Sequence, residues 1–486
     1  RPKLELKFSY MNRIGKYKSL GHRERYFFLL IIVILIPVSS LSQDGVDANF
    51  NMVSEPSNTI PVMYINTDHG KAITSKTEYV SATFYIADPA GQASIGSLEA
   101  PQTMQIRGRG HSSWRGDKKP YKIKLDNKLP LLGMPKNKHW ALLKFNPPTM
   151  AGFKLGNLIG MDWTPSCKPI EVVLNGDYIG LYLLTETIRI GKDRVNIYEQ
   201  PDRNVDASTI PGGWLVEVDN YFESNQIMFR ENPQWNINIT YHSPEVLSEA
   251  QKNWLTDEFK GINQDIYSKD KNHSKWEERI DVDAMARFFI IQEVLNNPDG
   301  FHGSFYLHKD LGEGQRWVAG PIWDLSCMKR EKTDYTYKMK VSYVFTPHWI
   351  DELLKDDDFC TAVRQAWKEF YPAKSDKWID DLVNDFYPYE SAYTHDCERW
   401  HKSVSRPLSE EATTLRFALK RNMEWFNLHL PGHETSDINF AKQNGKSYTV
   451  YSLQGIKIRE TSSYHDATHG LPKGIYILNG KKIFLP

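Results

Sequence analysis

Apolar and polar residues alternate over short stretches in the first part of the chain, which is the pattern of half-buried β-strands. The stretches PVMYINT, residues 61–67, and YVSATFYIAD, residues 79–88, alternate in this way, and turn residues separate them. They predict a small β region over residues 44–103, which we expect to form an accessory layer.

Another alternating stretch predicts a strand with one cationic face. In PYKIKL, residues 120–125, the apolar residues fall on one face and Lys122 and Lys124 fall on the other. Two lysines on one strand face can reach a phosphate group. The alternative is a solvated strand face with a surface ion pair, which contributes little to stability.

The clearest local signal is IEVVLNGDYIGLYLLTE, residues 170–186. Two β-rich runs flank Asn175-Gly176, a dipeptide typical of a two-residue hairpin turn. Glu186 falls on the same face of the second run as its apolar neighbours. We expect this carboxylate to orient one of the lysines of the cationic strand.

After about residue 244 the apolar residues recur at helical spacing. Residues 280–297 predict a helix that Asp281 or Asp283 caps and that the turn sequence NNPDG ends. Asp299 stands immediately past this end. A later helix is predicted over residues 409–430.

Two further groups of strands are predicted around these helices. Residues 304–310 and 316–325 form a strand pair joined by the turn LGEGQ, and Asp324 ends the second strand. The long helix beyond them is capped by Ser409 and stopped by a Pro-Gly pair. The last 40 or so residues return to strands, with a hairpin turn at Asn479-Gly480.

Charge is balanced over the whole chain but not within it. The 486 residues are enough for two or three domains, and 60 basic residues match 60 acidic ones. Composition therefore predicts no nucleic-acid partner. Basic residues nevertheless gather between residues 105 and 154, where only Asp117 and Asp126 oppose them. Such a region attracts phosphate or another anion, and a solvated basic face is the alternative.

The N-terminal region has the pattern of an export signal. A basic segment after Met11 leads to the apolar run YFFLLIIVILIPV, residues 26–38, and small residues follow it. We interpret residues 11–43 as a signal peptide, with an N-terminal membrane anchor as the alternative. Of the four cysteines, Cys360 and Cys397 are the two that an oxidising compartment would allow to pair, and the sequence leaves this open.

Asp299 and Asp324 are the residues most suggestive of chemistry. They bracket the predicted strand pair, whose ends would meet in a hairpin, so that the two carboxylates share one site. Carboxylates held together repel, and a divalent cation such as Mg²⁺ relieves the repulsion. The alternative is that both acids cap backbone N–H groups. The loop IRGRGHSSWRG, residues 106–116, presents Arg107 and Arg109 and can bind an anion, although it is no Walker P-loop.

Six motifs taken in order resemble the CotH family of spore-coat-protein-H-like atypical protein kinases. They are MQIRGRGHSSW, KKPYKIKL, LLGMPKNKHWALL, IEVVLNGDYIGLYLLTETIRIGKDRVNI, NNPDGFHGSFYLHKD and GPIWDL. The resemblance spans roughly residues 104–430. It implies an α+β, divergent protein-kinase-like fold of two lobes over residues 104–432. It also implies binding of ATP with Mg²⁺ or Mn²⁺ and a protein substrate phosphorylated on Ser or Thr.

The resemblance assigns roles to particular residues. Asp299 matches the catalytic aspartate that accepts the substrate hydroxyl proton, and Asp324 matches the metal-binding aspartate. Lys122, or else Lys119 or Lys124, neutralises the nucleotide phosphates, and Glu186 pairs with that lysine by analogy with ordinary kinases.

Two positions depart from the family pattern. Many relatives carry a second acid where this chain has Ser326, and many carry Asn where it has Ser304. A serine hydroxyl or a water would then have to serve as the oxygen ligand of the metal, and an inactive pseudokinase is one reading of these changes.

The C-terminal segment, residues 444–486, resembles the tail modules of surface proteins exported by Bacteroidetes-type bacteria. It implies sorting by an outer-membrane secretion machinery, and a periplasmic, cell-surface or extracellular location. A different class of function is also open: a kinase-shaped surface protein that binds glycans or proteins through its many Trp and Tyr residues. Neither the protein substrate nor the oligomeric state follows from the sequence.

Overall fold

The computed structural model describes residues 55–219, 225–228, 238–268, 275–301, 303–331, 334–336, 349–400, 406–432, 448–452, 457–461, 471–472, 474–478 and 481–485. The predicted signal peptide, residues 11–43, lies outside these ranges. None of the helices within them is long and apolar enough to cross a membrane.

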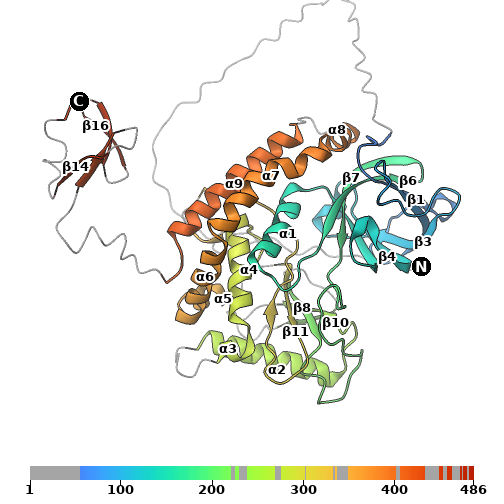
Figure 1. Ribbon diagram of the computed structural model, residues 1–486. Coiled ribbons are helices and arrows are strands. Elements are labelled where there is room, and N and C mark those ends of the chain that lie inside the picture. Colours follow the sequence, from blue (N-terminus) through green and yellow to red (C-terminus); the bar gives the residue numbers. More distant parts are fainter. Residues whose placement is uncertain are drawn as a thin grey trace, which may run out of the picture. The chain divides into compact units, whose positions relative to one another are not determined.

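The first architectural unit is a closed barrel of seven strands (Figure 1). The strands follow the order β1-β2-β3-β4-β5-β7-β6, and the barrel closes where β1 pairs in parallel with β6. The other neighbouring pairs are antiparallel. The strands are β1 (Val62–Thr67), β2 (Val80–Ala87), β3 (Gln102–Gly108), β4 (Tyr121–Leu129), β5 (Asn137–Lys144), β6 (Cys167–Leu174) and β7 (Asp177–Glu186).

Alternate residues of the strands fill the barrel interior. Ile123 and Leu125 of β4 pack with Trp140 of β5 and Leu184 of β7 in one buried cluster. The strands predicted over residues 61–67, 79–88 and 120–125 and the hairpin over residues 170–186 are therefore confirmed. Alternation locates these strands because one face of each is buried and the other is not.

The barrel corrects the expected accessory layer. β1 and β2 pair directly with the strands that follow them, and a boundary between residues 103 and 104 would cut β3. The sequence shows where a strand lies but not which strand it pairs with, so a layer and a barrel have the same local pattern.

A five-stranded sheet follows, in the order β12-β11-β8-β10-β9. Its strands are β8 (Trp214–Asp219), β9 (Gln226–Met228), β10 (Asn238–Ser243), β11 (Phe305–Lys309) and β12 (Val318–Ala319). The predicted pairing of β11 with β12 is confirmed, but β12 has two residues rather than ten. Gly320, at φ 117°, and Pro321, which has no N–H to donate, end the strand early, so Asp324 lies on the segment beyond it.

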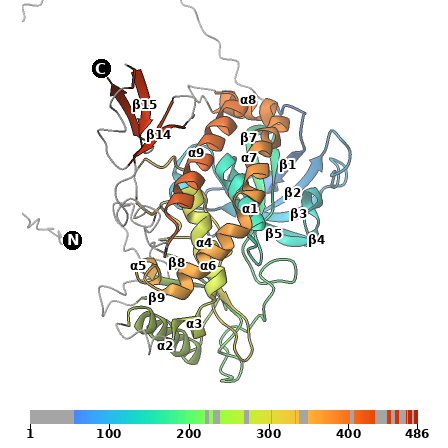
Figure 2. The same cartoon turned by 60° about the vertical axis from the view of Figure 1, so that its left-hand side comes forward.

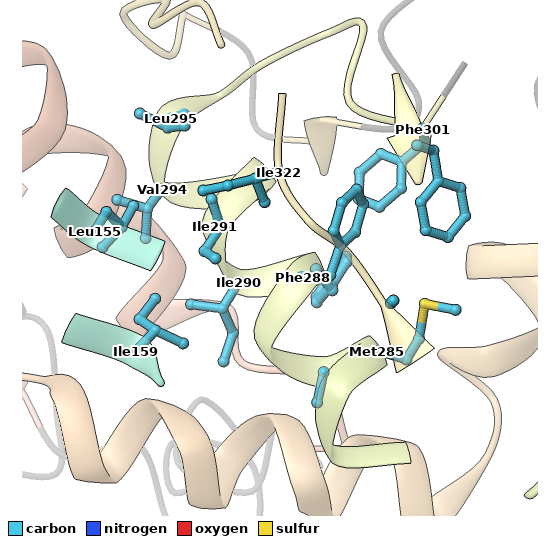
Figure 3. Packing of buried hydrophobic residues seen from close by; sticks show 14 of the residues in the cluster. Leu155, Ile159, Met285, Phe288, Ile290, Ile291, Val294, Leu295, Phe301 and Ile322 are labelled. Carbon is cyan, nitrogen blue, oxygen red and sulfur yellow. The ribbon is translucent and has the colours of Figure 1, made fainter. Parts of the chain in front are cut away.

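Nine α-helices occur in the described ranges. They are α1 (Pro147–Ile159), α2 (Glu249–Ile266), α3 (Trp276–Arg279), α4 (Val282–Leu295), α5 (Trp349–Leu353), α6 (Asp357–Phe370), α7 (Ala373–Phe386), α8 (Glu390–Arg399) and α9 (Leu408–Leu428). α1, α6 and α9 all pack on α4 (Figure 2). Figure 3 shows Leu155 and Ile159 of α1 beside Val294 and Ile290 of α4 in this core.

The helix starts show what the sequence predicts and what it misses. Asp281 caps α4, because its Oδ1 accepts from the Ala284 N–H at 2.8 Å. Ser409 does not cap α9, which begins at Leu408. Pro407 occupies the N-cap position, and Glu390 of α8 supplies the capping acceptors: its two carboxylate oxygens accept from the Leu408 N–H at 2.8 Å and the Ser409 N–H at 3.0 Å. A cap from another helix has no local sequence signature.

The barrel and the helices meet at the β6–β7 hairpin. The Asp396 carboxylate of α8 accepts from the Leu181 N–H at 2.9 Å and contacts the Lys118 ammonium. Gly180 allows this approach: a Cβ there would lie 2.1 Å from Asp396 Oδ1, and its φ of 98° suits glycine.

All four cysteines are free thiols. The disulfide that the sequence left open between Cys360 of α6 and Cys397 of α8 is therefore not formed.

The C-terminal segment forms a four-stranded antiparallel sheet of its own. The order is β14-β13-β15-β16, and the strands are β13 (Tyr448–Tyr451), β14 (Lys457–Thr461), β15 (Gly474–Leu478) and β16 (Lys481–Leu485). β15 and β16 pair as a hairpin whose two connecting residues, 479 and 480, lie outside the described ranges.

Candidate active site

The first acid of the predicted pair lies on the turn that ends α4. Asn296 adopts the left-handed conformation, with φ 48°, and ends the helix. The buried Asn297 follows, and its side-chain amide donates to Gln292 Oε1 at 3.0 Å. This bond ties the turn to the last turns of the helix and fixes where Asp299, two residues further on, is presented.

The segment that carries the second acid lies directly against this turn. The Ser326 hydroxyl donates to Asn297 Oδ1 at 2.8 Å, and the Met328 N–H donates to the Leu295 carbonyl at 3.1 Å. Asp324 precedes these contacts and has a φ of 52°, a conformation that non-glycine residues seldom adopt. Backbone conformations of this kind concentrate at functional sites.

The two carboxylates are called the acid pair below, and Asp299 is close enough to Asp324 to affect its ionisation. Desolvation raises the pKa of Asp299. Desolvation also raises the pKa of Asp324, and the Asp299 and Glu217 carboxylates raise it further, while the Arg109 guanidinium lowers it. Both acid side chains reach solvent although neighbouring atoms crowd them. Within the described part of the chain, neither carboxylate accepts a hydrogen bond or forms an ion pair.

Three cations lie on the outer side of the barrel strands or just beyond them, and the charge of one of them, Arg109, acts on Asp324. Arg107 of β3 lies opposite Lys122 of β4 in the strand register. Arg109, just after β3, places its guanidinium 5.4 Å from the centre of the Trp323 ring, beside Asp324. We call Arg107, Arg109 and Lys122 the basic cluster. Burial and, after it, the neighbouring charges of Arg107, Arg189 and Arg109 lower the pKa of Lys122 to about 8.

The other two candidate lysines lie differently. Lys119 precedes β4, and its ammonium donates to the Trp114 carbonyl at 2.8 Å and stacks over the Trp114 ring. This lysine therefore holds the loop after β3. Lys124 is an exposed residue of β4, two positions from Lys122 and on the same strand face.

The structure does not pair Glu186 with Lys122. In the barrel register Ile123 lies opposite Trp140, and Trp140 lies opposite Glu186, so Glu186 belongs to the inward face and Lys122 to the outward face. The Glu186 carboxylate instead faces Arg194, with Oε1 3.8 Å from its Nε, and accepts from the Ser166 N–H at 2.9 Å. Glu186 thus belongs to the end of the barrel interior, and the expected analogy with the kinase Lys–Glu pair is wrong for Lys122.

Three polar residues of the five-stranded sheet also belong to the site, and the sequence did not predict them: Glu217, His242 and Tyr306. Glu217 of β8 lies opposite Tyr306 of β11, and Glu217 Oε2 lies 2.8 Å from His242 Nε2. The charge of Glu217 affects both Arg109 and Asp324. A signal existed in WLVEVD, residues 214–219, where two acids two positions apart share one face of an otherwise apolar strand.

The two serines are part of the site, but only one has a described partner. Ser326 donates to Asn297 and so connects the two acid-bearing segments. Ser304 lies just before β11, with a φ of 54°. The neighbouring His302 lies outside the described residues.

The donor set fits a hard divalent cation. Two solvent-reaching carboxylates offer oxygen ligands, which Mg²⁺ and Mn²⁺ prefer, and the repulsion between them is the kind that a cation relieves. A separate acidic group, Glu277 with Asp356 and Asp358, lies elsewhere. There Asp356 is explained as the cap of α6.

The family follows from comparison with known proteins. The chain belongs to the CotH kinase protein family, whose model matches residues 106–423. A search of curated proteins gives no match. Membership supports a kinase-like function at the level of the family, with ATP and a divalent metal as its general requirements. The matched range contains the acid pair and the basic cluster.

Proposed function

We propose that this protein is a metal-dependent kinase that transfers the γ-phosphate of ATP to Ser or Thr hydroxyls of a protein substrate. The observation that carries the proposal is that Asp299 and Asp324 lie on neighbouring segments, with the Arg109 guanidinium beside Asp324. A phosphate chain requires cations on one side and metal-binding carboxylates on the other, and the position of Arg109 supports such a division here.

Each group has a distinct task in this proposal. The Asp299 carboxylate accepts the proton of the substrate hydroxyl, and its raised pKa makes it a better base than an ordinary aspartate. The Asp324 carboxylate binds Mg²⁺, which when bound neutralises the charge of the phosphate oxygens. Lys122 and Arg109 hold the phosphates, and Arg107, opposite Lys122 on the adjacent strand, adds a third positive charge. Ser326 keeps the two acid-bearing segments in register.

The proposal includes a kinase-like division of labour between two lobes. The barrel would contribute the phosphate-binding cations, and the helical part with the five-stranded sheet would contribute the acids. The Ser326 hydroxyl already donates to Asn297, so water has to complete the metal coordination where many relatives carry an acid.

We also propose that the protein is exported and acts in the periplasm, at the cell surface or outside the cell. The apolar run over residues 26–38 and the separate C-terminal sheet support this proposal. A secretion machinery that recognises the C-terminal sheet remains part of the proposal. The competing function is a surface protein that binds glycans or proteins through its many Trp and Tyr residues. It has less support, because six of the Trp side chains are fully buried: Trp140, Trp214, Trp276, Trp317, Trp349 and Trp367.

The test uses the chain from residue 44 onward, with Mg²⁺, ATP labelled on the γ-phosphate and casein as a generic acceptor. Calorimetry measures nucleotide binding separately. Asp299→Asn should abolish label transfer and leave binding of Mg²⁺ and ATP within about threefold, whereas Asp324→Asn should weaken binding at least tenfold, about 1.4 kcal/mol.

The matched control is Asp257→Asn, an exposed acid of α2 outside the site. It should behave as the unaltered chain does. A folded chain that binds no nucleotide with either Mg²⁺ or Mn²⁺ would rule the proposal out.

A further inference from the structure

A pocket of about 850 Å³ lies next to the segment that carries Asp324. The start of α1, the residues after Asp324 and one side of α9 form its walls. The residues that matter here are Asn146, Cys327, Phe417, Lys420 and Arg421. Its volume is in the range of pockets that bind small molecules or peptide side chains.

The apolar part of the pocket has an exposed aromatic ring. Pro147, Pro148, Leu415 and Ala418 line it, and Phe417 is 67% exposed beside them. An exposed Phe at the edge of an apolar hollow gains free energy when another apolar group covers it. The occupant should therefore carry an aliphatic or aromatic side chain.

The charges around the pocket favour an acidic occupant. Lys329, Lys420 and Arg421 oppose two carboxylates, those of Glu411 and Glu424. An apolar side chain flanked by carboxylates is complementary to this arrangement.

The pocket is also near the acid pair. Cys327 is three residues from Asp324, so their Cα atoms lie at most about 11 Å apart. The Asn146 side-chain amide, another wall of the pocket, donates to the Leu325 carbonyl at 3.3 Å. A chain bound in the pocket therefore passes within a few residues of Asp324.

We propose that this pocket binds the protein substrate, through a segment in which an apolar side chain lies beside Asp or Glu residues a few positions from the phosphorylated hydroxyl. This inference rests on the proposed kinase function and names the class of substrate that the enzyme selects.

The experiment measures peptide binding without requiring catalysis. The chain from residue 44 onward carries a fluorescent label and is applied to an array of mixtures of 12-residue peptides. Every mixture has a central Ser, and in each mixture one other position holds a single known residue. The chain should select Phe, Leu or Met next to Asp or Glu. Phe417→Ala should reduce this binding at least fivefold, and Lys420→Glu should shift the preference from acidic to basic neighbours.

Two variants outside the pocket are matched controls. Tyr387→Ala removes another exposed aromatic residue, 75% exposed, and Lys368→Glu reverses an exposed lysine of α6. Both should keep the selection of the unaltered chain. An array without selection, or the same selection in the Phe417 and Lys420 variants, overturns the proposal.

Calorimetry with Mg²⁺ and ATP separates the two proposals. If the unaltered chain binds no nucleotide but still selects acidic apolar peptides, the kinase function fails and the peptide pocket stands. If Phe417→Ala weakens nucleotide binding as much as peptide binding, the pocket belongs to the nucleotide site and the inference is wrong.

Discussion

The ammonium of Lys118, just before β4, contacts the carboxylate of Asp396 in α8, and both side chains are buried. Lys118 also donates to the Leu181 carbonyl at 2.5 Å, so it binds the hairpin and the helix together. Because β4 carries Lys122 and the helical part carries the acids, this contact helps to fix the two sides of the site relative to each other.

Removal of the Asp396 carboxylate should lower the stability of the fold. Asp396→Ala leaves a buried lysine without its carboxylate, and we expect the free energy of unfolding to fall by about 3–5 kcal/mol. Urea unfolding followed by tryptophan fluorescence measures this loss. The control is Asp177→Ala. It removes the exposed carboxylate that pairs with Arg399, and it should lower the free energy of unfolding by less than about 1 kcal/mol.

A double variant distinguishes lost attraction from stranded charge. Lys118→Met combined with Asp396→Ala should recover part of the stability that Asp396→Ala alone removes, since no buried charge is then unpaired. A double variant less stable than either single variant would contradict this explanation.

Gly180→Ala tests the close approach at the same hairpin. The added Cβ would stand 2.1 Å from Asp396 Oδ1, at a φ of 98° that alanine adopts with difficulty. We expect a loss of at least about 2 kcal/mol in the free energy of unfolding. Gly176→Ala, at a turn with φ 81° and open space around it, is the control for the backbone effect alone. Equal losses in the two variants would show that contact with Asp396 is unimportant.

Lys122 predicts a pH dependence of anion binding. Its pKa is about 8, so the ammonium is charged below that pH and neutral above it. The affinity for ATP should therefore fall as the pH rises from 7 to 9.5, and Lys122→Met should bind weakly with little dependence on pH in that range. Calorimetry at several pH values measures both, and an unchanged slope in Lys122→Met would exclude this lysine as the titrating group.

The same shift predicts a change in stability. The unfolded chain keeps the Lys122 proton up to about pH 10.5, whereas the folded protein releases it near pH 8. Between these values the unfolded state binds more protons, so the contribution of Lys122 to the free energy of unfolding rises with pH. The difference between the unaltered chain and Lys122→Met over pH 7–10 isolates this contribution.

Ser326→Ala tests the bond between the acid-bearing segments. Loss of the hydrogen bond to Asn297 should cost about 1 kcal/mol of stability. Phosphoryl transfer should fall by a larger factor than ATP binding, because the acid pair loses its alignment. Ser326→Cys keeps a weak hydrogen-bond donor, so its rate of phosphoryl transfer should lie between those of the unaltered chain and Ser326→Ala. Unchanged transfer in Ser326→Ala would show that Asn297 holds the turn without it.

Local patterns predicted most of the elements. The hairpin at Asn175-Gly176 and the Asp281 cap depend on residues close in sequence, and both are confirmed. The segments that carry Asp299 and Asp324 are neighbours through the Ser326–Asn297 bond, although β12 is far shorter than predicted, and the shared role of the two acids stays a prediction.

What the sequence did not predict depends on contacts between distant segments. Glu186 meets Arg194 because the barrel register turns it inward, and Glu217 joins the site because β8 lies beside β11. The Glu390 cap of α9 comes from another helix. In each case the side chain is ordinary in its own stretch, and only the strand register or the helix packing gives it a partner.

Inward and outward residues alternate along β4, so the fold of this strand depends on its number of residues as well as on its composition. Ile123 packs in the apolar interior of the barrel, and Lys122, the residue before it, lies on the outward face of the strand. Loss or gain of one codon within this strand would drive lysines into the interior and isoleucine into water. Natural variants of β4 should therefore keep the number of residues in the strand constant, even where outward residues other than Lys122 change.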